Sequence, residues 1–317
     1  AELARESCRK PGSEVITALE ELGEQDDPIL ELRRRMYMVR AGLWSQDERL
    51  ERIIEDADAW ASELPDIPEA RATSAGWLGQ LAYTSGDYER SSQLHAFAAE
   101  NKRRRSARIA SQLGRVWALL DGDRGAEAAE VVEEVAREAR ACRHHAYELQ
   151  ALQLARWVAY RNGALPETDD DLLDAIGLMG NIEFEARTFI IEAAVCWRRG
   201  DFTTALDYAT RGADCWVMSG MTAGATLCQA LAMAIRVEMN EAIEAEEHAR
   251  WCERASEVRA PLLALQALGL LASVAPLGQE LRDWMREAAQ KLDAPGRAKR
   301  REIISIDEAL EMASVTL

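Results

Sequence analysis

The feature that most constrains the fold of this chain is a turn of Gly, Asp and an aromatic residue that recurs along it. The turn occurs as Gly86-Asp87-Tyr88 and again as Gly200-Asp201-Phe202. The two glycines lie 114 residues apart (200 − 86), which is three periods of 38 residues. Gly readily takes the positive φ that ends a helix, and Asp caps the helix that follows. The spacing therefore predicts helical hairpins repeated along the chain.

Small residues at matching places indicate where the helices of each hairpin approach most closely. Leu78-Gly79 is followed after 35 residues by Leu113-Gly114. A large side chain at such a place would hold the two helix axes apart. The small residues expected on the second helices are Ser91, Ala98, Ala205 and Ala209.

The composition is that of a helical protein. Hydrophobic residues make up 48% of the chain and aromatic residues only 6%. Ala, Leu, Glu and Arg are frequent, and no segment alternates polar with β-branched residues as a strand would. We expect helices near 13–23, 28–43, 46–63, 69–85, 88–102, 106–120, 124–141, 145–162, 169–178, 182–199, 202–217, 221–239, 241–256, 259–274, 278–292 and 305–315.

The chain resembles the tetratricopeptide-repeat proteins, with degenerate and slightly lengthened repeats. The resemblance is specific over 74–100 and 189–215 and moderate over 108–136, and Glu192 stands where the family usually has Leu. It implies an all-α fold, a right-handed α-solenoid of about eight antiparallel hairpins. We expect one continuous solenoid, with irregular helices over 1–68, the repeat array over 69–292 and a capping segment over 293–317.

The net charge and the cysteines limit which classes of partner and which cellular compartment the sequence favours. The formal net charge of −17 repels phosphate backbones, so nucleic acid is not an expected partner. The six cysteines are scattered without a C-x-x-C pair, which indicates a reducing, cytoplasmic compartment. No apolar run approaches the roughly 20 residues of a membrane span. The Ala- and Arg-rich composition favours a bacterial source.

Catalytic and metal-binding motifs are not evident. Cys142, His144 and His145 cannot all aim at one zinc ion from a single helix, and His248 with Cys252 provides half a site at most. The acidic stretch 121–125 lacks the ligand spacing of a calcium loop. There is no nucleophile elbow, phosphate loop or dinucleotide fingerprint. We expect no enzyme activity, no metal and no cofactor.

A groove on the concave face is the expected binding surface, because the first helix of each hairpin lines it in such arrays. Arg and aromatic side chains there suit an extended peptide, which is bound through pockets, backbone hydrogen bonds and carboxylate pairing. The Asn and Lys residues with which chaperone-binding relatives hold a carboxylate are not found. The predicted groove residues are Gln80, Tyr83, Ser111, Arg115, Gln153, Trp157, Tyr160, Arg161, Ile190, Trp197 and Arg198.

A dense basic run is a second candidate surface. It comprises Lys102, Arg103, Arg104, Arg105 and Arg108, and its alternative interpretation is a solvated turn whose cations favour a helix end. Another basic cluster, Arg297, Lys299, Arg300 and Arg301, precedes the last expected helix.

Three functions remain open from sequence. The first is a scaffold or adaptor that binds a protein or peptide within a larger regulatory or assembly system. The second is the sensor module of a bacterial signalling regulator, which binds a signal peptide or small ligand and controls an effector. An enzyme on an α/α scaffold is the third and least favoured. The oligomeric state is not predicted.

Overall fold

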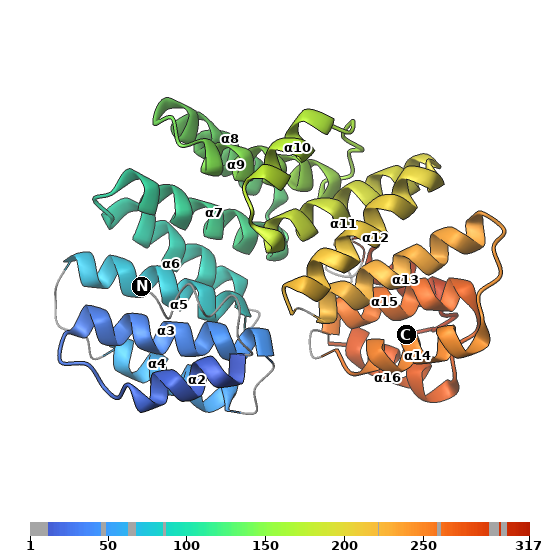
Figure 1. Cartoon of the computed structure of the whole chain (residues 1–317), viewed down its shortest axis with the longest axis horizontal. Coiled ribbons are helices and arrows are strands. Elements are labelled where there is room, and N and C mark those ends of the chain that lie inside the picture. Colours follow the sequence, from blue (N-terminus) through green and yellow to red (C-terminus); the bar gives the residue numbers. More distant parts are fainter. Residues whose placement is uncertain are drawn as a thin grey trace. The chain divides into compact units, whose positions relative to one another are not determined.

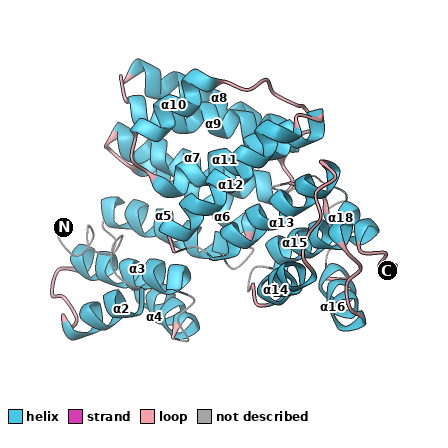
Figure 2. Cartoon of the chain, turned by 45° about the vertical axis from the view of Figure 1, so that its right-hand side comes forward, coloured by secondary structure: helices cyan, strands magenta, loops and turns pink. Residues whose placement is uncertain are grey.

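The described part of the chain is entirely helical (Figures 1 and 2). The computed structural model describes residues 12–45, 49–62, 68–84, 87–220, 222–258, 261–291, 298 and 303–317, and no strand occurs among them. None of the helices described is long and apolar enough to cross a membrane. The chain divides into two compact units, Ala1–Leu152 and Gln153–Leu317. The one-array domain organisation stays a prediction.

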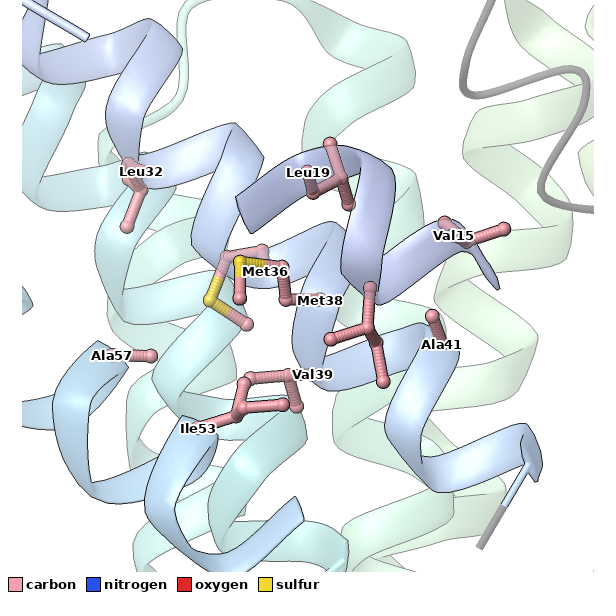
Figure 3. Close-up of a cluster of buried hydrophobic side chains, with 10 residues drawn as sticks. Val15, Leu19, Leu32, Met36, Met38, Val39, Ala41, Ile53 and Ala57 are labelled. Carbon is pink, nitrogen blue, oxygen red and sulfur yellow. The ribbon is translucent and has the colours of Figure 1, made fainter. Parts of the chain in front are cut away.

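The first unit begins with three helices that share a core (Figure 3). They are α2 (Gly12–Glu21), α3 (Pro28–Ser45) and α4 (Leu50–Ser62). Ten of their apolar side chains are at most 8% exposed, and Figure 3 shows Met36, Val39 and Ile53 pointing toward one another between the helices. The buried carboxylate of Glu31 is held by Arg34, Arg35 and the backbone N–H of Gln25.

Hairpins follow in the first unit, and each helix packs on the next. The elements are α5 (Pro68–Thr84), α6 (Tyr88–Asn101), α7 (Arg105–Asp121), α8 (Gly125–Ala141) and the first half of α9 (His145–Arg161). Within this unit α5 packs on α6, α6 on α7 and α7 on α8. This order is that of stacked antiparallel hairpins.

The repeated glycines make room for one histidine. A Cβ atom at Gly79 would lie 3.0 Å from the imidazole of His95, and one at Gly114 would lie 2.5 Å from it. His95 on α6 is thus enclosed between α5 and α7, and Ser91 on the same helix donates to the carbonyl of Gly79. Ser91 and Ala98 are both 0% exposed, so the prediction that small residues mark the helix contacts is confirmed here.

The predicted turn chemistry is confirmed where it is described. Asp87 and Asp201 each accept a hydrogen bond from the backbone N–H three residues later. Gly200 ends α11 at a φ of 79°. Gly86 and the 297–301 cluster lie outside the described residues. In the turn after α7, Asp123 takes the positive φ of 63°, whereas Gly122 has a φ of −82°.

The second unit, from the second half of α9 onward, is also helical. Its elements are α10 (Asp170–Leu178), α11 (Ile182–Arg199), α12 (Phe202–Met218), α13 (Thr222–Glu238), α14 (Ala245–Ser256), α15 (Pro261–Val274), α16 (Gln279–Ala289) and α18 (Ile306–Met312). The helices α11, α12, α13 and α15 pack in sequence, and α18 packs on α15. In Figure 1 these helices run from the yellow-green of α11 to the orange of α15, and Figure 2 labels α18.

A buried ion pair explains the departure from the repeat pattern at residue 192. Glu192 is 0% exposed, and Arg156 on α9 makes three hydrogen bonds of 2.7–3.0 Å to its carboxylate. Burial raises the pKa of Glu192, and Arg156 opposes that effect. This ion pair thus links α9 to α11 at a position where the repeat pattern usually has an apolar residue.

Each expected helix is present, but four boundaries differ by three or four residues. The helix expected at 46–63 begins at Leu50, and the one expected at 278–292 ends at Ala289. The expected helix at 241–256 begins at Ala245, because Asn240 has a φ of 63° and ends α13 before an extended connection. The last helix ends at Met312 rather than 315, because Ser314 has a φ of 54° and Val315 donates back to Leu310. This closure is the left-handed helix end that usually carries Gly or Asn.

Acid is expected to destabilise the first unit through His95. Burial, with a smaller contribution from the Lys102 cation, lowers the pKa of His95 from its ordinary value of 6.5 to about 4. Protonation therefore favours the unfolded chain, so stability is full above pH 6.5 and falls as the pH drops toward 4. From pH 7 to pH 5 the free energy of unfolding should fall by about 2 kcal/mol. Denaturant unfolding at both pH values measures this loss.

The matched comparison is His95→Leu with His145→Leu, because the His145 side chain is 85% exposed. His95→Leu should remove most of the pH dependence, and His145→Leu should leave it unchanged. An equal pH dependence in the His95→Leu variant would show that the buried imidazole is not its source.

The contact between α15 and α18 should not tolerate a larger residue at 269. A Cβ atom at Gly269 would lie 2.5 Å from Cα of Ala309, so Gly269→Ala must push α18 away. We expect a loss of 1–3 kcal/mol, roughly the cost of overpacking a core. Gly278→Ala is the control, because a Cβ there meets nothing within 4 Å. Equal melting temperatures for the two variants would contradict this packing.

Candidate peptide-binding site

A short segment before α18 is buried inside the second unit. Ile303, Ile304 and Ile306 are each 0% exposed, and Ser305 is 5% exposed. Ile303, Ile304 and Ser305 are not helical and precede α18, so their backbone groups need partners other than a helical ladder. Side chains of the array provide those partners.

Three side chains from three helices bind the backbone of this segment. Tyr160 on α9 donates its hydroxyl to the carbonyl of Ile303 at 2.5 Å. Arg198 on α11 donates to the same carbonyl at 3.0 Å. On α15, the amide oxygen of Gln266 accepts from the backbone N–H groups of Ile303 and Ile304 at 2.9 and 3.3 Å.

Arg198 is the centre of this arrangement. Its Nε donates to the hydroxyl of Tyr160 at 3.0 Å, and its Nη2 reaches both carboxylate oxygens of Glu308 at 3.0 Å. Burial alone would lower the pKa of Arg198, but Tyr160 and Glu308 outweigh it and raise that pKa. The guanidinium is therefore a charged group that is matched to a carbonyl and a carboxylate.

Glu308 is held in place by its own helix start as well. Burial would raise the pKa of Glu308, but the backbone N–H of Ser305 and the Arg198 cation lower it overall. Ser305 and Glu308 form a capping box, in which Ser305 N–H donates to Glu308 at 2.6 Å and Glu308 N–H donates to Ser305 at 3.1 Å. The carboxylate thus points at Arg198 in a fixed direction.

The predicted groove residues of the second unit occupy different environments. Tyr160 and Arg198 bind the chain's own segment, and Trp197 lies beside the Arg198 guanidinium, 5.9 Å from its ring centre. The remaining predicted residues are buried, at exposures of 1–8%: Gln153, Trp157, Arg161 and Ile190. The amide of Gln153 has no hydrogen-bond partner in the described part of the unit.

The predicted groove residues of the first unit do not gather around a bound segment. Gln80 is exposed, and Tyr83 donates to Asp121 at 2.5 Å. Ser111 is 3% exposed and accepts from Nζ of Lys102 at 2.8 Å. Arg115 is half-buried. The Lys102 ammonium of the basic run therefore points into the hairpin, and burial lowers the pKa of that group.

Metal binding finds no further support in the described ranges. No three His, Cys, Asp or Glu side chains gather there as ligands. The Sγ atom of Cys252 lies 3.6 Å from Nε2 of His248, whose ring contacts the carbonyl of Leu271.

Sequence reasoning missed Gln266, Ile303 and Glu308. The only local signal was the Ser305-x-x-Glu308 pattern, which is typical of a capping box and predicts a helix start rather than a contact with α11. Because 105 residues (303 − 198) separate Arg198 from Ile303, no spacing rule connects them.

Comparisons with known proteins support the fold. No protein-family model matches the chain, and no curated protein matches it in sequence. Among solved structures, the chain is similar to a Rap protein complexed with competence and sporulation factor. The TM-score is 0.61 and the match covers 96% of this chain and 89% of that one, at 10% sequence identity. The likeness shows a shared helical-repeat fold, of the tetratricopeptide-like kind that the repeats indicated.

Proposed function

We propose that this protein is a peptide-binding module of a regulatory or assembly system, which recognises an extended segment of a partner. Tyr160, Arg198 and Gln266 are the side chains assigned to that recognition. They form hydrogen bonds with a backbone carbonyl, two backbone N–H groups and one carboxylate. These side chains are suited to bind an extended chain that carries an acidic residue a few positions later.

The observation that carries the proposal is the bound segment 303–308 itself. Backbone hydrogen bonds give affinity for any extended chain, whereas side-chain pockets and charge pairing select its sequence. Both kinds of contact are present here, with buried isoleucines beside the backbone contacts and Glu308 on Arg198. A partner with apolar residues followed by a carboxylate would compete with this segment for the same groups.

The fold likeness favours the sensor form of this function over a passive scaffold. The similar Rap protein was crystallised with a separate factor, so a helical array of this fold can hold one. In a sensor, exchange of the internal segment for a partner segment would change the position of α18. An effector that binds at α18 would then distinguish the two positions of this helix.

A peptide copy of residues 303–312, IISIDEALEM, provides the direct test. The tethered segment has an effective concentration on the order of millimolar, so the unaltered chain should bind the labelled peptide weakly. Glu308→Lys removes the internal ion pair, while the added peptide still carries its own glutamate. We expect about tenfold tighter binding by this variant, because a charged hydrogen bond contributes roughly 1.5–3 kcal/mol. Fluorescence anisotropy measures the dissociation constants.

Arg198→Ala combined with Glu308→Lys should lose that gain, since the peptide carboxylate then has no partner. Arg199→Ala in the same background is the matched control, because Arg199 is exposed and its hydrogen bond among the described residues is to the carbonyl of Leu165. Circular dichroism establishes that the variants remain helical. Folded Glu308→Lys protein that binds the peptide no better than the unaltered chain would refute the proposal.

A further inference from the structure

Two basic turns lie together at one end of the hairpins in the first unit. One turn joins α6 to α7 and the other joins α8 to α9. Arg105 in the first donates to Sγ of Cys142 in the second at 3.6 Å, and Arg108 pairs with Glu138 at 3.0 Å. We call the surface they form the basic edge, comprising Arg103, Arg104, Arg105, Arg108, Arg137, Arg140 and Arg143.

Most cations of the basic edge are exposed and available. Arg108 and Arg140 are neutralised by Glu138 and Glu148, at 3.0 and 2.7 Å. The other arginines of the edge are exposed and form no ion pair with a described residue: Arg103, Arg104, Arg105, Arg137 and Arg143. The chain has a net charge of −17, so these unpaired arginines give the basic edge a positive electrostatic potential that contrasts with the charge of the whole chain.

A groove opens beside these cations, between α6, α7 and α8. Its volume is about 510 Å³, and its lining includes small Ala99 and Ala141 together with Arg108 and Arg137. Gln112 also lines it, and the buried amide oxygen of that residue has no hydrogen-bond partner in the described structure. A buried acceptor without a donor costs free energy, so an incoming N–H group would be stabilised here.

We propose that the basic edge and its groove form a docking surface for an acidic segment of a partner protein. Carboxylates of the segment pair with the unpaired arginines, a small apolar side chain enters between Ala99 and Ala141, and a backbone N–H meets Gln112. This surface lies wholly within residues 99–143. It is independent of the peptide site in residues 153–317.

The groove favours a protein segment over nucleic acid. Glu100, Glu134 and Glu138 line the same groove, so a continuous phosphate backbone would meet carboxylates beside the arginines. The negative charge of the whole chain repels a long polyanion as well. A short segment can place its acidic residues on the arginines and neutral residues next to the glutamates.

The test measures binding of a fluorescein-labelled peptide of alternating Glu and Ala, about a dozen residues long. Fluorescence anisotropy is recorded with the full chain at low ionic strength. Arg104→Glu/Arg137→Glu should weaken binding about tenfold or more, because both attractions become repulsions. Ala141→Trp fills the groove without changing the charge and should weaken binding severalfold.

The matched control is Arg33→Glu/Arg250→Glu, which makes the same change in net charge at exposed positions that do not belong to the basic edge. Its affinity for the peptide should stay within about twofold of the unaltered chain at equal ionic strength. Equal weakening by both double variants would overturn the proposal, since net charge alone would then govern binding. Single-stranded DNA that displaces the peptide and binds more tightly at the edge would also overturn it, in favour of nucleic acid.

Discussion

The guanidinium of Arg198 connects parts of the carboxyl-terminal unit that are far apart in sequence. Through it α11 meets the hydroxyl of Tyr160 on α9, the carbonyl of Ile303 and the carboxylate of Glu308. A planar guanidinium has five N–H donors in a fixed fork, so its Nε binds the first of these acceptors while its Nη2 binds the other two, whereas a lysine has a single nitrogen. The position of α18, and with it the segment 303–306, depends on this contact and on the close fit of Gly269 against Ala309.

The helices were largely predictable from sequence because their signals are local. Caps such as Asp87, Asp169 and Asp201 act within three residues, and Gly200 ends α11 by its own backbone conformation. Beside the misplaced start of α14 and the misplaced end of α18, a residue other than Gly takes the left-handed conformation: Asn240 and Ser314. Sequence rules rank those residues below Gly, so the ends were set too far out.

The sequence predicted two residues of the candidate site but not the segment that they contact, because that contact joins residues far apart in the chain. The repeat register predicted Tyr160 and Arg198 as groove residues, and in the structure both side chains donate to the carbonyl of Ile303. That they bind a partner stays a prediction. What lies against them is residues 303–308 of the same molecule, and that pairing depends on how the array folds back on itself within the second unit. Glu192 likewise departs from the repeat pattern, and its partner Arg156 lies 36 residues earlier on α9, beyond the reach of a local sequence rule.

The most direct test of the account is hydrogen–deuterium exchange across residues 303–312 of the unaltered chain at neutral pH. The backbone N–H groups of Ile303 and Ile304 are buried and bound by Gln266, so their exchange should be slowed to a degree comparable with the core of α15. Exchange of this segment at the rate of an unstructured chain, while α11 and α15 remain protected, would contradict the central claim that side chains of α9, α11 and α15 bind the backbone of Ile303 and Ile304.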